Sequence, residues 1–282
     1  MKVGYVQLAP KFGMIEENVE KAISFIESAD ADLLVLPELF NTGYLFLSSE
    51  EALELAEPVP DGYTTQKLIE VAEKTKTYIV AGIAERADNK VYNSAVIVGP
   101  RGFMGVYRKS HLFYKEKLIF APGDSGFKVF DLGIAKIGVI ICFDWCFPEA
   151  TRILAIKGAD IICHPANLVL PYAPKVMLAR SIENRVFTIT ANRVGTDERG
   201  GEKLEFIGLS QVTSPKMEVL IQAGSEEESV GVVEIDVSHA RNKWITEYNH
   251  VFNDRRIDLY EELLKSPANL TNSSLKLMIF TM

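Results

Sequence analysis

The sequence lacks the features that mark several large classes of protein. Only 3 of its 282 residues are cysteine, which is too few for a disulfide-stabilised scaffold. No apolar run approaches the roughly 20 residues that a membrane-spanning helix needs. No cleavable export signal precedes the first strand pattern, "MKVGYVQLAP". These absences predict a cytoplasmic protein with reduced thiols and no membrane partner.

An excess of positive charge is also missing. The chain carries 30 Lys and Arg against 38 Asp and Glu, a net charge of −8. Because nucleic-acid surfaces gather Lys and Arg against phosphates, we expect no nucleic-acid partner. No stretch rich in Pro, Gly or Ser divides the chain. We therefore expect one α/β domain over residues 1–265, with a C-terminal arm at 238–265 and a loosely held tail at 266–282.

What the sequence does contain is a repeated unit of strand, helix and strand. The first copy (residues 2–38) has the strands "KVGYVQLAP" and "ADLLVLPE", and the second (136–166) has "KIGVIICFD" and "ADIICHPA". Apolar strands also resemble each other by chance, but here both the elements and their order match. The remaining patterns predict strands at 77–85, 92–100, 102–109, 187–194, 208–223 and 230–237, and helices at 61–76 and 171–186.

Two chemically unusual residues follow the strands of this unit. Glu38 comes after "LLVLP", and Cys142 comes after "IGVII". Strand–helix–strand units place their strands parallel, and ligands collect beyond the carboxyl ends of such strands. We therefore expect the carboxylate and the thiol to face one crevice. The alternative for Glu38 is a helix N-cap or a surface turn.

The cysteines allow more than one interpretation. Cys142 precedes a helix start at Pro148, and a thiol near a helix N-terminus ionises more easily. Cys163, and with it Cys146, fits a small buried hydrophobe. A zinc site would have to use the three cysteines and His164, but Cys163 and His164 would point to opposite faces of one strand. A redox C-x-x-C pair is absent. As a base for a Cys–His hydrolase, His111 in "VYRKSHLF" is the candidate, with Lys109 predicted on the same strand face.

Three stretches together resemble the nitrilase superfamily of carbon–nitrogen hydrolases, closest to its small archaeal-type nitrilase and amidase branch. They are "LLVLPELFNTGY", "YRKSHLF" and "GVIICFDWCFPEATR", in the order of the family's catalytic motifs. The resemblance implies catalytic roles for Glu38, Lys109 and Cys142, and for Glu116 in the looser "FYKEKLIF". It also implies a four-layer αββα sandwich of two mixed sheets with an internal pseudo-two-fold repeat. Such proteins form homodimers or larger assemblies, and the segment 255–265 is predicted as a helical partner contact.

These residue types suit hydrolysis of a carboxamide without a metal or organic cofactor. Cys142 would attack the carbon, Glu38 would move protons, and Lys109 with the backbone N–H of Phe143 would face the oxyanion. The pocket is predicted to use Tyr44, Phe113, Trp145 and Asn167, although aromatic residues at a strand edge also serve as core.

The expected function is an amidase that acts on small aliphatic amides through a thioester and releases ammonia. The sequence Cys-Phe-Asp after the nucleophile differs from the Cys-Trp-Glu of many nitrilases, which favours amides. The alternatives are a nitrilase, an N-carbamoyl amide hydrolase, a Cys–His hydrolase that uses His111, and a non-catalytic interaction scaffold. No Arg or Ser pair stands out as a carboxylate clamp, which disfavours N-carbamoyl amino acids.

Overall fold

The computed structural model describes residues 1–265, so the predicted tail at 266–282 lies outside the described residues. The chain folds as two compact units, Met1–Lys243 and a second unit that begins at Trp244. The first unit holds both sheets and every site residue predicted above. Within residues 1–265, none of the helices combines the length and apolar character that a membrane crossing requires.

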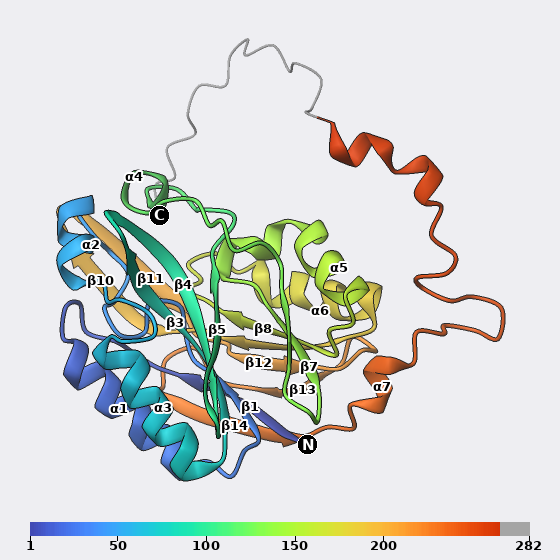
Figure 1. The fold of residues 1–282 in the computed structure, drawn as a ribbon, viewed down its shortest axis with the longest axis horizontal. Coiled ribbons are helices and arrows are strands. Elements are labelled where there is room, and N and C mark those ends of the chain that lie inside the picture. The colour runs from blue at the N-terminus through green and yellow to red at the C-terminus, as the bar shows by residue number, and fades with distance from the viewer. Residues whose placement is uncertain (266–282) are drawn as a thin grey trace. The chain divides into compact units, whose positions relative to one another are not determined.

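Two mixed sheets of six strands each form the first unit (Figure 1). The first sheet has the strand order β14 (Ser229–Glu234), β1 (Lys2–Gln7), β2 (Leu33–Val35), β3 (Tyr78–Ala87), β4 (Lys90–Gly99), β5 (Gly102–Arg108). The second has the order β13 (Val219–Gln222), β12 (Gln211–Thr213), β9 (Phe187–Ala191), β8 (Ile161–Pro165), β7 (Lys136–Val139), β6 (Val129–Asp131).

The two sheets repeat one pattern of strand directions. In each, three neighbouring strands are parallel: β1, β2 and β3 in the first sheet, and β7, β8 and β9 in the second. In the first sheet, the antiparallel strand β14 flanks this trio on one side, and β4 followed by β5 flank it on the other. In the second sheet, β6 takes the place of β14, and β12 followed by β13 take the places of β4 and β5. The predicted sandwich with its internal repeat is therefore confirmed.

Side chains along the buried strands point alternately to the two faces of the sheet, and this explains how the sheets and helices form layers. On β2, Leu33 and Val35 face the second sheet, whereas Leu34 and Leu36 face helices α1 (Ile15–Ser28) and α3 (Tyr63–Thr75). Each of these side chains is fully buried, and such burial contributes about 1.5–3 kcal/mol per side chain. The predicted helix at 61–76 and the helix of the first repeat are thus confirmed as the outer layer on this sheet.

Helices α5 (Pro148–Ile156) and α6 (Ala173–Asn184) cover the second sheet on its outer side (Figure 1). Helix α5 begins at Pro148, as predicted, because proline suits the first helical position, where the chain needs no N–H donor. Its Leu154 side chain packs directly on Gly138 of β7, where an added Cβ would lie 2.9 Å from it. The strand that leads to Cys142 is thereby held between the other sheet and a helix.

Several predicted elements differ from the structure. The segment 208–223 is two short strands, β12 and β13, joined by a turn, and the hairpin of β10 (Val194–Arg199) and β11 (Glu202–Ile207) was not predicted. Helix α2 (Ser49–Leu55), capped by Ser48, was also missed. The predicted helix at 255–265 is instead two 3₁₀ turns, at Ile257–Leu259 and Glu261–Leu264. Short helices are marginal unless an apolar face is packed, and here those side chains are exposed.

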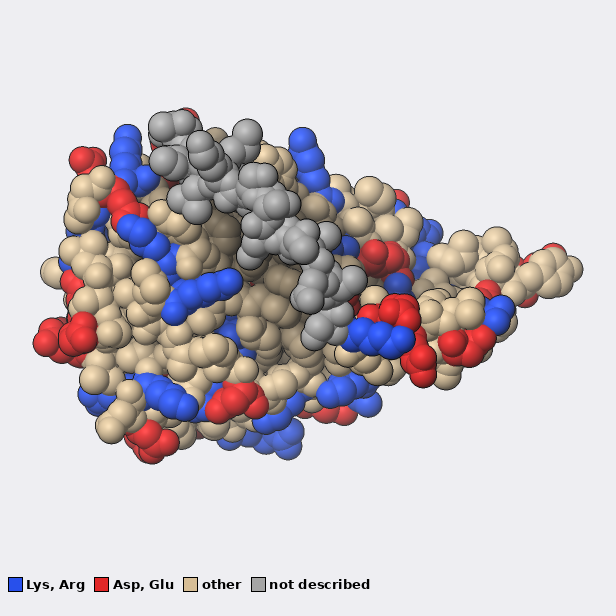
Figure 2. Space-filling view, turned by 90° about the horizontal axis from the view of Figure 1, so that it is seen from above, with Lys and Arg blue, Asp and Glu red and all other residues tan. Residues whose placement is uncertain are grey.

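The surface carries both signs of charge. On the face drawn in Figure 2, Lys and Arg side chains are interspersed with Asp and Glu, and the described residues there form no continuous basic patch.

Gly82 of β3 is a sensitive point, because the main chain of Glu38 packs directly against it. A Cβ there would lie 2.4 Å from the Cα of Glu38 and 2.7 Å from the Pro37 carbonyl oxygen. At Gly231 of β14 a Cβ would instead meet the far end of the Tyr5 ring, at 2.5 Å. The loop main chain at Pro37 and Glu38 is hydrogen-bonded to Gly82 and cannot move aside as a ring can.

We therefore expect Gly82→Ala to lower the free energy of unfolding by about 3 kcal/mol, the upper end for overpacking, and Gly231→Ala by roughly 1 kcal/mol. The denaturant midpoint of each variant measures the difference. Equal losses in the two variants would contradict the close approach at Glu38.

Candidate active site

The four residues predicted to be catalytic meet between the sheets. The Lys109 ammonium lies 2.6 Å from Oε1 of Glu38 and 2.8 Å from Oε1 of Glu116. All four, including Cys142, are buried, with at most 6% of each residue exposed. Glu38 and Lys109, 71 residues apart, follow strands β2 and β5 of the first sheet, whereas Cys142 follows β7 of the second, so the site forms only when both halves of the sandwich are in place.

Glu38 lies in the loop that follows β2. The loop is fixed on β3 by hydrogen bonds from Gly82 N to Pro37 O (3.1 Å) and from Phe40 N to Gly82 O (2.9 Å). Oε1 of Glu38 accepts from Asn93 Nδ2 at 2.7 Å as well as from Lys109. Its other oxygen, Oε2, is buried without a hydrogen-bond partner among the described residues. One carboxylate oxygen is therefore held in place while the other remains available to a ligand.

The environment of Glu38 makes its carboxylate a better proton acceptor than an ordinary one. Burial raises the pKa of the Glu38 carboxyl, the charge of Lys109 lowers it and the charge of Glu116 raises it, with a net upward direction. Burial alone lowers the pKa of Lys109, but the two carboxylates raise it by more, so the ammonium stays protonated. The site thus holds a permanent cation beside a carboxylate that binds a proton more readily than usual.

Lys109 and Glu116 come from one connection that follows β5. The Lys109 N–H donates to Asn93 O at 2.8 Å, which continues the ladder with β4 by one residue. Glu116 opens the short helix α4 (Glu116–Ile119), and its Oε2 accepts from the N–H of Phe113 at 3.0 Å. Its Oε1 accepts from the Tyr44 hydroxyl at 2.8 Å. Both functional groups are therefore oriented by main chain and by a buried hydroxyl.

Cys142 is in a strained backbone conformation. It starts a 3₁₀ turn, η1 (Cys142–Cys146), with φ at +39°. The left-handed region costs about 1–2 kcal/mol for a residue with a Cβ. His164 of β8 supports the turn from below, because its Nε2–H donates to Cys142 O at 3.0 Å and its Nδ1 accepts from the Thr190 hydroxyl at 3.0 Å. Burial lowers the pKa of His164 to about 4, so the ring is neutral in this role.

The Cys142 thiol is protonated at rest. Burial raises its pKa well above the ordinary value, the charge of Glu38 raises it further, and Lys109 lowers it by less. The easier ionisation that a nearby helix start would give is outweighed here, because burial and the carboxylates raise the pKa of this thiol by more than Lys109 lowers it. Asn167 contacts both Glu38 and Cys142. Its Nδ2 donates to the backbone O of Glu38 at 2.8 Å, and its backbone carbonyl oxygen lies 3.9 Å from the thiol sulfur of Cys142. A thiol in this setting needs a base, and Glu38 is beside it.

A small cavity opens at the thiol. Its wall contains three of the four predicted pocket residues, and the full lining is Phe113, Cys142, Phe143, Trp145, Asn167, Leu168, Val169 and Leu170. Every lining side chain except that of Asn167 is apolar or sulfur-bearing. The backbone N–H groups of Cys142 and Phe143 have no acceptor among the described residues, as at the start of any helical turn. The cavity therefore offers an apolar wall and free N–H donors close to one thiol.

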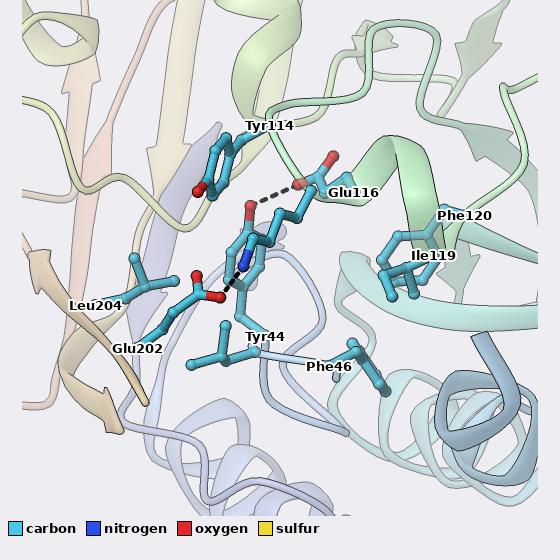
Figure 3. A pocket seen from close by; sticks show the side chains of 10 residues that line it. Tyr44, Phe46, Tyr114, Glu116, Ile119, Phe120, Glu202 and Leu204 are labelled. Atoms are coloured by element: carbon cyan, nitrogen blue, oxygen red, sulfur yellow. Dashed lines mark hydrogen bonds and ion pairs between the residues drawn. The ribbon is translucent and has the colours of Figure 1, made fainter. Parts of the chain in front are cut away.

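The fourth predicted pocket residue, Tyr44, lines a separate cavity, together with Glu116 (Figure 3). In Figure 3 its hydroxyl points at Glu116, and Phe46, Ile119 and Phe120 form an apolar side. At the opening, Lys115 forms an ion pair with Glu202. Tyr44 thus supports Glu116, and the structure does not place it in the cavity at the thiol.

The alternative roles considered for other residues find no support in the geometry. Strand β5 ends at Arg108, so Lys109 and His111 lie in a loop and not on one strand face. The His111 ring pairs with Asp144, at 2.7 Å from Nδ1 to Oδ1. Cys163 is buried, as expected, but Cys146 is exposed, which corrects the prediction of a buried side chain. The 3₁₀ turn rotates it away from the core.

Three polar residues of the site were not predicted: Asn93, Asp144 and His164. All three are buried and hydrogen-bonded to catalytic candidates or to their flanking main chain. Asn93 and His164 interrupt apolar strand patterns, in "VYNSAV" and "IICHPA", and a polar side chain inside such a run needs a buried partner. That signal could have found them.

Metal binding has no ready donor set here. Within residues 1–265, no group of three or more His, Cys, Asp or Glu side chains is arranged to hold a metal ion.

Comparison with known proteins gives a consistent result. A family model described as carbon-nitrogen hydrolase matches residues 2–243. A curated protein named "Nitrilase" from Pyrococcus abyssi is 56% identical over 263 residues, which cover 92% of this chain and 99% of that protein. An "(R)-stereoselective amidase" from a Pseudomonas species is 34% identical, over 95% of this chain and 96% of its own length.

A solved structure agrees with these relatives. The crystal structure of a carbon-nitrogen hydrolase from Helicobacter pylori G27 superposes with a TM-score of 0.83 at 29% identity, over 94% of this chain and 98% of that one. The resemblance drawn from three motifs is therefore confirmed across the length of the first unit.

Proposed function

The chain belongs to the carbon-nitrogen hydrolase family of the nitrilase superfamily, and on that premise we propose that it hydrolyses small, uncharged amides to acid and ammonia through a thioester on Cys142. The observation that carries the proposal is the divided role of the Glu38 carboxylate. Oε1 is held by Lys109 and Asn93, whereas Oε2 is buried and unpaired, and the carboxylate interacts electrostatically with the Cys142 thiol. A buried oxygen without a partner costs free energy unless a ligand or a proton uses it.

In the first step Glu38 accepts the thiol proton as the Cys142 sulfur bonds to the amide carbon. The carbonyl oxygen becomes an oxyanion, which Lys109 and the free N–H of Phe143 stabilise. Glu38 then gives its proton to the amide nitrogen, the C–N bond breaks, and ammonia leaves. The acyl group remains on sulfur as a thioester. Because the Glu38 pKa is raised, the carboxyl can both take up and return this proton.

In the second step water attacks the thioester, and Glu38 accepts a proton from the water. The C–S bond breaks, the carboxylic acid leaves, and the thiolate regains its proton from Glu38. Glu116 orients Lys109 through a hydrogen bond, while Tyr44 holds Glu116. No step in this sequence calls on a cofactor.

The cavity at the thiol supports a small, apolar acyl group. Phe113, Trp145 and Leu168 lie on its wall, and no lining side chain carries a charge. A carboxylate or ammonium on the acyl chain would have to shed its water there without a partner, at a cost of several kcal/mol. This disfavours N-carbamoyl amino acids and other charged substrates.

Nitriles are a second candidate substrate class, and one observation favours them: the 56% identical relative is named "Nitrilase". The same thiol could add to a nitrile carbon, after which two waters would be consumed and ammonia released. The proposed compartment is the cytoplasm, where the three free thiols stay reduced.

Ammonia release from a panel of small amides, nitriles and N-carbamoyl compounds tests the proposal. We expect turnover of short uncharged amides, no turnover with Cys142→Ala, and nearly full turnover with Cys146→Ala, which is the matched control on the same turn. Iodoacetamide should label both thiols, since Cys146 is exposed, but activity should be lost in step with Cys142 labelling. Turnover by Cys142→Ala would refute the proposal, and nitriles as the better substrates would select the second candidate.

The role of Glu38 can be separated from that of Lys109. Lys109→Ala should lower kcat by roughly 10²-fold or more through loss of oxyanion stabilisation. Glu38→Gln keeps an acceptor for Lys109 but cannot take a proton, so we expect no steady turnover and, at most, a slowly formed thioester that persists. Intact-mass spectrometry after mixing with a good amide would detect that adduct. Turnover near the wild-type rate would show that Glu38 is only a structural carboxylate.

The second unit supports the expectation of a homodimer. Six of its large apolar side chains are between 55% and 90% exposed: Ile245, Tyr248, Ile257, Leu259, Leu263 and Leu264. An apolar set of this size within about 20 residues needs a partner surface, and a second copy of the chain is the proposed one.

Light scattering is expected to give twice the 31.4 kDa chain mass. Leu263→Asp with Leu264→Asp should shift the protein toward monomer at micromolar concentration, because a stable interface does not bury unpaired charge. Leu118→Asp, at a position 75% exposed in the first unit, is the control and should not. A wild-type monomer at that concentration would disprove the dimer.

A further inference from the structure

One buried carboxylate, that of Asp144, ties the loop of Lys109 to the turn of Cys142. Asp144 is 0% exposed and accepts four hydrogen bonds. Oδ2 accepts from the Tyr107 hydroxyl (2.8 Å) and from Ile141 N (2.9 Å). Oδ1 accepts from His111 N (3.1 Å) and from His111 Nδ1 (2.7 Å).

In the sequence, the donors stand next to the reactive groups. Tyr107 stands two residues before Lys109 and His111 two residues after it, while Ile141 immediately precedes Cys142. A displacement of the Asp144 carboxylate would therefore move the cation and the nucleophile relative to each other. No other carboxylate of the described residues is recorded with bonds to both of these segments.

The same residue also holds the strained turn. Asp144 N donates to Ile141 O at 3.0 Å, and Ile141 N donates back to the Asp144 side chain. This reciprocal pair encloses Cys142, whose φ of +39° needs support from its surroundings.

We propose that Asp144, with His111 and Tyr107 as its donors, is a positioning residue that sets the distance between Lys109 and Cys142. The proposal rests on the roles given above to Lys109 and Cys142. The expected effect is on kcat, because a misplacement of about 1 Å at a reacting centre costs up to roughly 10²-fold in rate. None of the residues that donate to Asp144 lines the cavity at the thiol, so KM should change less than kcat.

Two interactions of His111 have to be separated in the test. Besides its bond to Asp144, the ring stacks on Phe147 with centroids 3.6 Å apart and planes at 10°. The variant His111→Phe keeps the stacking and loses the Nδ1 donor. The variant His111→Asn loses the stacking and keeps a donor, since the side-chain Nδ2 takes the position of Nδ1. Tyr107→Phe removes the other side-chain donor and keeps the ring that stacks on Phe127.

The experiment measures kcat and KM on one amide, normalised to titrated Cys142, together with the melting temperature. We expect His111→Phe and Tyr107→Phe to lower kcat by about tenfold or more with KM within about threefold, and His111→Asn to restore kcat to within about threefold of wild type. Thr188→Val is the matched control: it removes a buried hydroxyl pair with Thr213 (2.6 Å) in the second sheet, away from the turn. It should lower the melting temperature and leave kcat unchanged.

Coupling provides a test that simple loss of stability would not pass. In an Asp144→Asn background, adding His111→Phe should change kcat by less than about twofold, because the shared acceptor is already lost. If Asp144→Asn does not fold, the double variant Tyr107→Phe with His111→Phe replaces it, and losses smaller than the product of the single losses are expected.

The proposal is overturned if His111→Phe turns over at the wild-type rate, if His111→Asn is no better than His111→Phe, or if Thr188→Val lowers kcat as much. Failure of the proposed function looks different: Cys142→Ala and Lys109→Ala would then remain active. Inactivity of those two variants beside a fully active His111→Phe would overturn the positioning role alone.

Discussion

The buried ion cluster around Lys109 is the constraint on which the rest of the structure depends. One ammonium lies between two carboxylates in the buried interior, 2.6 Å from Glu38 and 2.8 Å from Glu116. A charge in such a place is tolerated only when it is paired, and removing one partner costs about 3–5 kcal/mol. The cluster therefore forms only when β2, β5 and helix α4 reach their final places, and the catalytic geometry and the fold are specified together.

The cluster also carries one more negative charge than it can neutralise. Burial is the main reason that the Glu38 pKa moves upward, and the second carboxylate, Glu116, adds to the shift, while Lys109 opposes it. Burial, together with the charge of Glu38, raises the pKa of the Cys142 thiol. At rest, the site therefore holds a neutral thiol near a carboxylate that readily takes a proton. This arrangement avoids a reactive thiolate in the absence of substrate.

Much of this could be predicted from sequence because the signals were local or repeated. The duplicated strand–helix–strand unit fixed the parallel core of each sheet, and Glu38 and Cys142 stood at strand exits where ligands gather. The hairpin at β10–β11 and the exposure of Cys146 could not be found in this way. The first depends on packing beneath the Tyr44 loop, where Asp197 accepts from the N–H groups of Tyr44 and Leu45, and the second on a 3₁₀ turn whose cause lies in Asp144.

The hidden role of Asp144 shows why the motif around the nucleophile extends beyond the nucleophile. A strained residue at Cys142 can exist only where its neighbours over-determine the backbone, and here the same carboxylate that closes the turn also anchors both flanks of Lys109. Asp144 therefore both maintains the strained backbone at Cys142 and fixes the position of Lys109. A sequence could not keep the left-handed cysteine while relaxing the link to Lys109, because both interactions end on a single side chain.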